Sequence, residues 1–357
     1  MKLTSVISLC SGIGAFEKAI VDVIGQDRIR VGFSEIDKNA IGVYRKHFPE
    51  SMELGNLQQI SRGQLDQLVS ESTCQIVVAG FPCQNISMAN NVTRHGLKGE
   101  KSGLFRDVMR VIHQVRTSKT PQQNKLFVVI ENVRGSSATM DEITQTLRAE
   151  LSEDKIYVTP IDSSHFSAQA RVRNFWTNFP ISTNYPSVDE LVLADALMPI
   201  ETVMQRIGEV QMSPKFVAMY NKIMKEKPAV NSYHASLVKT TPTGVMYWRH
   251  TVEQNKPRAR WQKYPFSDSA QPKSKTITTN HPNFHIIERR NTTAGEGAFI
   301  VRKFFAEELE RLFCFPHGWT AETIDGLSLS NNDRIKLLGN SIVVTVVRHI
   351  VTDLLKA

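Results

Sequence analysis

Segments with strand character and segments with helix character alternate through the first half of the chain, and this alternation constrains the fold more than any other feature. Short apolar runs with the length and composition of buried strands occur at residues 6–9, 30–35, 76–79 and 126–130. Segments with apolar residues at helical spacing occur between them, at residues 16–24, 39–47 and 104–115. Strands that alternate with helices form a parallel sheet covered on both faces. We therefore predict an α/β fold built on such a sheet.

Polar and reactive residues stand at the end of each of these predicted strands or within five residues after it. In strand order they are Gly12 and Gly14, Glu35, Cys83, and Glu131. The carboxyl ends of parallel strands meet at one edge of a sheet, and ligands of such sheets bind there. We therefore expect these residues to lie together and to form the functional site.

The pair Gly12 and Gly14 predicts a loop that lets the backbone approach a cofactor closely. A dinucleotide fingerprint requires a third glycine three residues later, and Glu17 stands at that position, which argues against NAD and a Rossmann oxidoreductase. An acidic residue at the end of the next strand, here Glu35, commonly holds ribose hydroxyls of an adenosine-bearing cofactor. A plain tight turn and a surface glutamate remain the alternatives.

Cys83 follows Pro82 on the loop that leaves the third predicted strand. An exposed cysteine whose thiolate is favoured is a strong nucleophile, whereas a lone cysteine is more often a small buried apolar residue. Glu131 ends a continuous apolar strand, so we expect it to be partly buried. Burial raises the pKa of a carboxyl group and would suit Glu131 to share a proton with a substrate nitrogen.

Composition narrows the protein class. The chain has 357 residues, 41% of them hydrophobic, and no apolar run approaches the length of a membrane span. It has four cysteines, Cys10, Cys74, Cys83 and Cys314, without a CxxC pair. These features predict a reducing, cytoplasmic location, no secretory leader, no disulfide framework and no structural metal.

The net charge of +8 favours a polyanionic partner. Between Lys239 and Lys275 there are eight Lys or Arg residues and two acidic residues, interleaved with aromatic residues. This combination suits contact with a nucleic-acid backbone, and the alternative is a solvated, loop-rich surface without a partner.

Several short motifs resemble those of the cytosine-C5 DNA methyltransferase family, and they occur in the family's order over nearly the whole chain. They include GFPCQ at 80–84, IENV at 130–133, QARVR at 169–173 and GNS at 339–341. The resemblance is to prokaryotic or phage members, with similarity to the eukaryotic de novo branch. It implies a Rossmann-like S-adenosylmethionine-dependent methyltransferase domain, with S-adenosyl-L-methionine as cofactor and S-adenosyl-L-homocysteine as product.

The resemblance also assigns a cofactor site. The residues that match its motifs are Cys10, Ser11, Gly12, Ile13, Gly14, Glu35, Ile36, Asn56, Leu57, Pro82, Leu104, Asn340, Ser341 and Ile342. Two of them depart from the family's pattern. Cys10 stands where the family usually has Phe near the adenine, and Asn56 replaces the usual Asp that meets the adenine amino group.

By the same resemblance, the Cys83 thiolate attacks C6 of a flipped-out cytosine, and Glu131 holds N3 and the exocyclic amine. Arg173 meets O2, Arg171 supports the same loop, and Gln84 belongs to the catalytic set. The predicted DNA-binding residues are Ser87 and Gln169, together with four chosen from the charge of the basic segment: Arg249, Arg258, Arg260 and Lys263.

The predicted substrate is double-stranded DNA, and the sequence leaves open a cognate restriction endonuclease as a second partner. We expect a monomer without membrane contact. One alternative is a tRNA cytosine methyltransferase, but such relatives carry a CFT tripeptide, whereas Cys314 and Phe315 are followed by Pro316. The other is a non-catalytic DNA-binding paralogue, which would lack motifs that this chain keeps.

We predict four parts in the chain. They are a catalytic domain at 1–183, an inserted target-recognition domain at 184–275, the remainder of the small lobe with a hinge at 276–330, and a C-terminal helix at 331–357 that returns to the catalytic domain. The apolar helix at 341–355 should pack beside the first helix, and Asn340 or Ser341 is a suitable N-cap. A further helix is expected at 304–313.

Overall fold

The computed structural model describes residues 3–81, 104–118, 125–152, 155–186, 193–207 and 304–357, with Thr276 and short strands at 248–251, 260–263, 286–289 and 299–302. Five residues assigned to the site from sequence lie outside the described residues: Pro82, Cys83, Gln84, Ser87 and Arg258. Three predicted DNA-binding residues lie on described strands, Arg249 on β8 (Trp248–Thr251), and Arg260 and Lys263 on β9 (Arg260–Lys263).

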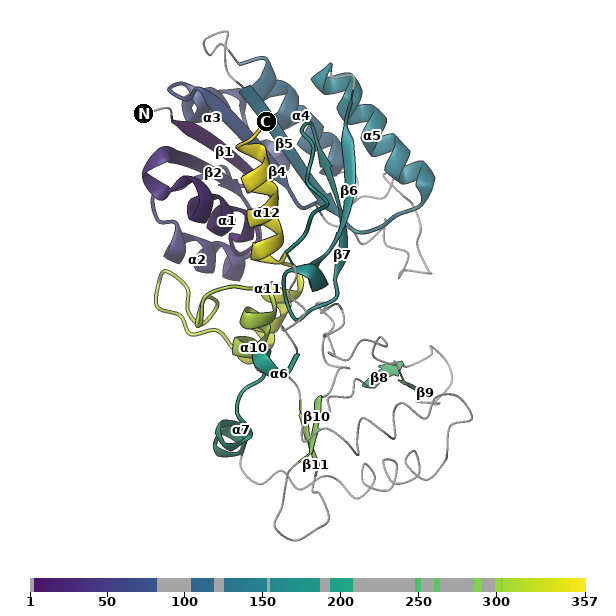
Figure 1. Ribbon diagram of the computed structural model, residues 1–357. Helices are drawn as coiled ribbons and strands as arrows, with labels where there is room; N and C mark the ends of the chain where they lie inside the picture. The colour runs from purple at the N-terminus through teal and green to yellow at the C-terminus, as the bar shows by residue number, and fades with distance from the viewer. Residues whose placement is uncertain are drawn as a thin grey trace.

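A seven-stranded sheet forms the centre of the described structure (Figure 1). Its strands are β1 (Thr4–Leu9), β2 (Ile29–Ser34), β3 (Met52–Glu53), β4 (Cys74–Ala79), β5 (Lys125–Asn132), β6 (Tyr157–Asp162) and β7 (Val172–Thr177). Their spatial order is β3-β2-β1-β4-β5-β7-β6. A separate two-stranded sheet joins β10 (Ile286–Arg289) to β11 (Phe299–Arg302), and another joins β8 to β9.

The helices of the first half are α1 (Ala15–Ile24), α2 (Lys38–His47), α3 (Arg62–Val69), α4 (Leu104–Arg116) and α5 (Ser137–Leu151). The later helices are α6 (Leu193–Ala196), α7 (Ile200–Ile207), α10 (Ala306–Leu312), α11 (Asn331–Gly339) and α12 (Val344–Leu354). The four strands and three helices predicted for the first half are confirmed, each within two residues of its observed ends.

The sheet is parallel from β3 to β5, as predicted, but its other edge is antiparallel, which corrects the expectation of a parallel sheet throughout. β7 pairs antiparallel with both β5 and β6. The connection between β6 and β7 runs only from Ser163 to Arg171. A parallel pair needs a crossover of about a dozen residues or more, so this connection favours a hairpin.

Helices cover both faces of the sheet, because alternate strand residues point to opposite sides. On one face, Val6 and Val78 share a hydrophobic cluster with α1, α2 and α12. On the other face, Ile7 and Val77 share a cluster with α3, α4 and α5. Both sides of the central strands are therefore buried, which explains why these strands are nearly uninterrupted apolar runs in the sequence.

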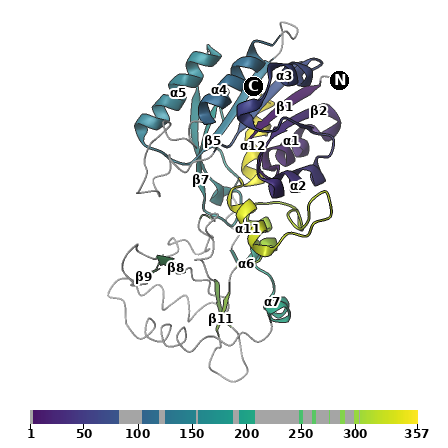
Figure 2. The ribbon, with the colours of Figure 1, turned by 180° about the vertical axis from the view of Figure 1, so that it is seen from behind.

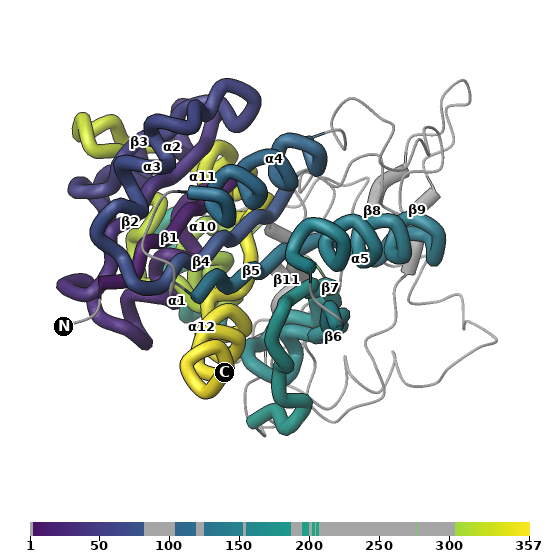
Figure 3. The backbone as a smooth tube through the Cα atoms, turned by 90° about the horizontal axis from the view of Figure 1, so that it is seen from above, coloured from purple at the N-terminus to yellow at the C-terminus, as the bar shows by residue number. Residues whose placement is uncertain are grey.

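The C-terminal helix returns to the N-terminal part of the chain, as predicted. α12 packs against α1, and Figure 3 shows the two helices together. The seven aliphatic residues predicted to form its buried face are all buried: Ile342, Val343, Val346, Val347, Ile350, Val351 and Leu354. Removing this much apolar surface from water contributes on the order of 10 kcal/mol.

The predicted N-cap is wrong in detail. α12 begins after Val343 without a side-chain cap, and Asn340 instead ends α11. The reason is that α11 continues to Gly339, so the chain must turn between the two helices before α12 can start. The stretch Asn331–Leu354 has the length and hydropathy of a membrane span, but 67% of its apolar window is buried in the protein, as is typical of a core helix.

The same hydrophobic cluster extends beyond the C-terminal helix. Phe304, Leu309 and Phe313 are fully buried in it together with α1 and α12. Salt bridges from Lys336 to Asp37 and from Lys46 to Glu322 join this region to α2, and Figure 2 shows α11 beside α2. This shared core joins α10 to α1 and α12, and the predicted domain boundaries remain a prediction.

Helix α1 carries a buried acidic residue, Glu17. Glu17 is completely buried, and the Ser8 and Tyr44 hydroxyl groups are its nearest polar neighbours, without forming well-aligned hydrogen bonds to it. Burial raises the pKa of Glu17 to about 7. The pKa of Glu17 in the folded protein is therefore higher than its ordinary value of about 4.5. The contribution of Glu17 to the free energy of unfolding is fully present below pH 4.5 and is lost as the pH rises through 7.

We expect Glu17→Gln to remove this pH dependence. The variant and the wild type should unfold with similar free energies near pH 5, and the variant should become more stable by up to about 3 kcal/mol near pH 8.5. Urea unfolding at both pH values measures the difference. Glu71→Gln, which changes an exposed carboxylate, is the control and should show no such trend. If the free energy of unfolding changed with pH equally in Glu17→Gln and in the wild type, the raised pKa of Glu17 would be contradicted.

Candidate active site

The carboxyl ends of β1, β2, β4 and β5 lie side by side. Leu9 pairs with Ser34 on one side and with Ala79 on the other, and Ala79 pairs with Ile130. The loops that follow these four strands therefore start from one edge of the sheet. The structure brings the predicted residues together there, as far as it describes them.

The glycine loop, residues 10–14, turns sharply as it leaves β1. Cys10, Gly12 and Gly14 all have positive φ angles, of 54°, 57° and 85°. A Cβ atom on Gly14 would lie 2.6 Å from the Phe48 ring, so only glycine fits this position. Ser11 N donates to Ser34 O at 3.0 Å, which ties the loop to the end of β2.

Glu35 is bonded to the glycine loop and to its own turn. Its Oε2 accepts from Gly12 N at 2.9 Å, and its Oε1 accepts from Ile36 N and Asp37 N at 2.7 and 3.0 Å. These bonds fix the carboxylate at the sheet edge. A carboxylate has about four acceptor positions, so Oε2 keeps capacity for one more donor, such as a ribose hydroxyl.

The space beside Glu35 suits an adenosine group. The Ile36 side chain is 71% exposed although it is large and apolar. A Cβ atom on Gly12 or Gly55 would meet no atom within 4 Å, so both glycines border open space. An exposed apolar wall, a carboxylate and two bare stretches of backbone match the chemistry of an adenine, a ribose and a close backbone approach.

Asn56 and Leu57 lie on the neighbouring loop, but their side chains are already engaged. Asn56 caps the short helix η2 (Leu57–Gln59), its Oδ1 accepting from Gln58 N at 3.0 Å, and Leu57 is buried. Arg110 of α4 holds this loop by donating to Leu57 O at 2.7 Å and to Ile60 O at 2.9 Å. Leu104, the first residue of α4, is partly exposed.

Glu131 lies at the same edge and has the environment that the sequence predicted. Its side chain is only 15% exposed, and its Oε1 lies 3.1 Å from Arg173 Nε. A Cβ atom on Gly80 would lie 3.5 Å from the other carboxylate oxygen. Burial raises the pKa of Glu131, although the charges of Arg173 and Arg171 oppose the shift. The carboxyl group therefore retains a proton more readily than an exposed glutamate.

Asn132 fixes the start of the loop that carries Cys83. Its Nδ2 donates to Phe81 O at 3.1 Å, and Gly80 N donates to Leu9 O at 3.3 Å. The chain thus leaves β4 with its last two described residues held by β5 and β1. Asn132 belongs to the IENV motif, but the sequence analysis assigns it no role; its position directly after Glu131 was the available signal.

Arg171 and Gln169 are both buried within the protein. Arg171 is buried, donates to Ser341 O at 2.8 Å and to Gly339 O at 3.3 Å, and lies over the Phe313 ring. It therefore positions the segment between α11 and α12. Gln169 is fully buried with neither amide atom hydrogen-bonded, so its predicted contact with DNA remains a prediction that this burial weighs against.

The other predicted cofactor residues vary in exposure. Ile13 and Ile342 are buried, Ser341 is partly buried and Asn340 is exposed. Ser11 is buried, and its hydroxyl donates to Ser8 O at 3.0 Å. The side chains of Ser11, Ile13 and Ile342 are therefore committed within the protein, and the assignment of all five residues to the cofactor site remains a prediction.

Three of the four cysteines have environments that disfavour a thiolate. Burial, together with the Glu35 carboxylate, raises the pKa of Cys10 to about 12. Burial also raises the pKa of Cys74 and of Cys314. None of these three is therefore suited to act as a nucleophile near neutral pH.

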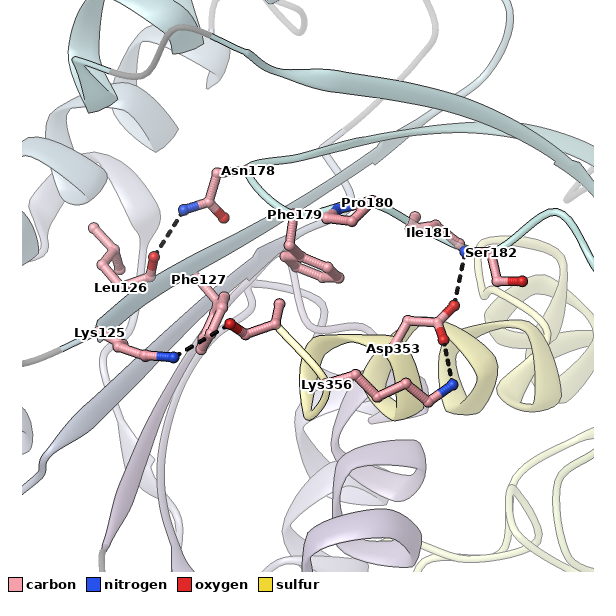
Figure 4. A pocket seen from close by; sticks show the side chains of 11 residues that line it. Lys125, Leu126, Phe127, Asn178, Phe179, Pro180, Ile181, Ser182, Asp353 and Lys356 are labelled. Carbon is pink, nitrogen blue, oxygen red and sulfur yellow. Dashed lines mark hydrogen bonds and ion pairs between the residues drawn. The ribbon is translucent and has the colours of Figure 1, made fainter.

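The described residues offer little evidence for a functional site elsewhere. Among the described residues, no cluster of His, Cys, Asp and Glu has the arrangement of a metal site. A cavity of about 750 Å³ lies at the opposite end of β5, between Lys125, Phe179 and Asp353 (Figure 4). Its charged groups satisfy one another, since Asp353 accepts from Ser182 N at 2.8 Å and from Lys356 Nζ at 2.8 Å.

A family model described as C-5 cytosine-specific DNA methylase matches residues 4–356 of the chain. Orphan methyltransferase M.SPRI of Bacillus phage SPR is 36% identical over 132 residues, which are 36% of this chain and 26% of that protein. Type II methyltransferase M2.BsuMI of Bacillus subtilis (strain 168) is 32% identical over 128 residues, or 36% of this chain and 28% of that protein. The aligned stretches span about a quarter of the length of these curated relatives.

Solved structures match over the whole length. The methyltransferase EhMeth of Entamoeba histolytica superposes with a TM-score of 0.59 at 16% identity, covering 100% of this chain and 99% of that one. The Dnmt2 methyltransferase of S. pombe gives 0.55 at 16% identity, covering 99% and 98%. At these identities the likeness concerns the fold.

Proposed function

Because the chain belongs to the C-5 cytosine-specific DNA methylase family, we propose that it is a DNA (cytosine-5-)-methyltransferase that acts on a short site in double-stranded DNA. The observation that carries the proposal is Glu131, a largely buried carboxyl group with a raised pKa that lies beside Gly80 and is paired with Arg173. It lies at the same sheet edge as Glu35 and the glycine loop, so one site offers a proton-sharing acid and a place for an adenosine group.

Cys83 is the proposed nucleophile. It follows Gly80 by three residues, and Gly80 borders the Glu131 carboxylate. The other three cysteines have raised pKa values. Attack of the Cys83 thiolate on C6 of cytosine forms a C–S bond and makes C5 nucleophilic. Loss of the C5 proton after methyl transfer then lets the C–S bond break, which releases the enzyme.

Glu131 and Arg173 hold the cytosine in this proposal. A protonated Glu131 donates to N3, which absorbs the charge that develops as the thiolate adds to the ring, and its other oxygen accepts from the exocyclic amine. Arg173 Nε lies 3.1 Å from Glu131 Oε1 and keeps the carboxyl group in place in either protonation state, and Arg173 also supplies donors for O2. The cytosine must be flipped out of the duplex, because its reacting atoms are not accessible within the stack.

S-adenosyl-L-methionine is the cofactor of this family, and when bound it supplies an electrophilic methyl group to the activated C5. In this chain the Glu35 carboxylate would hold the ribose, and the exposed Ile36 side chain would cover the adenine. The backbone at Gly12 and Gly55 would border the bound molecule, where the structure leaves open space. Asn56 would face the adenine amino group with the remaining lone pair of its Oδ1.

DNA contacts belong in this proposal to the inserted segment at 184–275. The +6 charge between Lys239 and Lys275 suits a phosphate backbone, and Arg249, Arg260 and Lys263 lie on the β8–β9 hairpin within it. We propose that the enzyme works as a monomer in the cytoplasm of a bacterial or phage-infected cell, where a cognate restriction endonuclease would be its partner in a restriction-modification system.

Transfer of a labelled methyl group tests the function. The purified protein should label duplex DNA from S-adenosyl-L-methionine, and digestion to nucleosides should yield 5-methyldeoxycytidine. Deep sequencing of bisulfite-treated DNA then identifies the target site. Transfer RNA is the competing substrate in the same assay. Label that enters tRNA and not DNA would replace the proposed substrate, and label in neither would support a non-catalytic protein.

A further inference from the structure

The loop between α10 and α11 reaches the glycine loop from the far end of the chain. Trp319 is buried, and its indole Nε1 donates to Ile13 O at 2.9 Å. Ile13 stands between Gly12 and Gly14, which both have positive φ angles. We propose that Trp319 is a positioning residue for the cofactor site, because it holds the backbone of the glycine loop in the conformation that binds S-adenosyl-L-methionine. This inference rests on the proposed function.

The bond matters because of where it acts. Glu35 holds Gly12 N, and Trp319 holds Ile13 O, so the two bonds fix two successive residues of the loop from different partners. Glycine has little intrinsic preference among backbone conformations, so this part of the loop depends on such anchors. The same Ile13–Gly14 peptide is held from its other side by Gly14 N, which donates to Ser11 O at 3.1 Å. Loss of the indole bond would remove one of these two restraints on the peptide and would weaken the alignment between Gly12 N and Glu35.

Trp319 is itself fixed by α2. Its ring stacks on His47, with centroids 3.5 Å apart and planes 6° from parallel. His47 Nε2 lies 2.7 Å from Trp319 O. A carbonyl oxygen can only accept, so His47 Nε2 carries the proton and donates. Burial lowers the pKa of His47, which keeps the ring neutral and compatible with this stacking.

A buried carboxylate holds the backbone on both sides of Trp319. Glu310 is fully buried and accepts from Gly318 N and from Thr320 N, each at 2.8 Å. Arg334 neutralises Glu310 through a bond of 3.0 Å and also pairs with Glu307. These bonds make the loop around Trp319 rigid. The indole N–H group is therefore held in a fixed position, and its hydrogen bond restrains the Ile13 carbonyl group.

Trp319→Phe tests the inference, because it keeps an aromatic ring and removes the N–H donor. Trp176→Phe is the matched control. Trp176 is also fully buried, and its Nε1 donates to Thr144 Oγ1 at 3.0 Å, but it lies between β7 and α5 and not at the glycine loop. Both variants lose one buried indole hydrogen bond, so they should lose similar stability.

Binding of S-adenosyl-L-homocysteine, measured by calorimetry without nucleic acid, separates the two roles. We expect its Kd to rise about tenfold in Trp319→Phe, the equivalent of one hydrogen bond at about 1.4 kcal/mol per factor of ten. Trp176→Phe should bind as the wild type does. The kcat of Trp319→Phe at saturating cofactor and its Kd for DNA should change less than twofold, since the loop's partner is the cofactor.

Incorporation of 3-benzothienylalanine at position 319 gives a second test, because it replaces only the N–H group with sulfur and keeps the bicyclic ring. It should show the same tenfold weakening as Trp319→Phe. Wild-type affinity in either 319 variant, or equal weakening in Trp176→Phe, would overturn the inference while leaving the methyltransferase assignment intact. A wild-type protein that binds no S-adenosyl-L-homocysteine would overturn both.

Discussion

Cys83→Ser should form no covalent adduct with DNA that carries 5-fluorocytosine, whereas the wild type should be trapped on it. With fluorine at C5, no proton is left on that carbon for a base to remove after methyl transfer. The C–S bond formed by Cys83 therefore cannot break, and the enzyme stays attached. The product should survive denaturing electrophoresis as a slower band. A serine hydroxyl has almost no anionic fraction at neutral pH, whereas a thiol with a pKa of about 8.5 before tuning has a usable one. Methyl transfer to ordinary cytosine should fall by roughly 10⁴-fold or more.

The remaining cysteines provide the controls. Cys10→Ser, Cys74→Ser and Cys314→Ser should still be trapped, because burial already disfavours the thiolate of all three residues. Cys83→Ser should retain its affinity for DNA, since the proposed phosphate contacts lie in the inserted segment. An adduct that persists in Cys83→Ser, or that disappears only when another cysteine is changed, would refute the nucleophile assignment.

Glu131→Gln should reduce kcat by roughly 10²–10³-fold while the protein remains folded. The amide keeps the shape of the side chain and can still donate to N3, but it cannot transfer a proton or balance the charge of Arg173. The loss should therefore appear in kcat more than in the Kd for S-adenosyl-L-homocysteine, which Glu131 is not expected to touch. Single-turnover kinetics with duplex DNA measure the chemical step directly.

Glu150→Gln is the matched control for this change. Glu150 of α5 is also a largely buried carboxylate paired with an arginine, since its Oε1 lies 3.1 Å from Arg116 Nε. It faces α4 instead of the sheet edge, so its replacement should alter stability slightly and leave kcat unchanged. Unreduced kcat in Glu131→Gln, or an equal reduction in Glu150→Gln, would contradict the role given to Glu131.

The parallel half of the fold could be predicted from sequence because burial on both faces leaves an unambiguous pattern. β4 and β5 each contain a continuous apolar run, at 76–79 and 126–130, and Cys83 and Glu131 follow these runs closely in the sequence. The position of Glu131 in a largely buried place could be inferred for the same reason. A polar residue at the end of an apolar strand is surrounded by the groups that bury the strand.

The parts that sequence reasoning missed depend on contacts between distant segments. β6 is an edge strand with alternating exposure and contains Pro160, so it lacks the apolar signal of the central strands. The orientation of Arg171 toward Ser341 O joins residues 170 positions apart. The bond from Trp319 to Ile13 spans 306 positions. No local pattern encodes such pairings, because both partners would be equally acceptable in many other surroundings.

The closure of the core by α12 has a consequence for how this protein can change. The chain leaves the shared hydrophobic cluster near Leu197 and re-enters it at Phe304, so the segment between these two residues is an insertion whose ends are brought together by the core, as the ends of a loop are. Doubling the length of such a loop costs only about 0.6 kcal/mol in closure entropy. Inserted segments of different length and sequence can therefore replace one another between these two residues at little cost to the stability of the shared core.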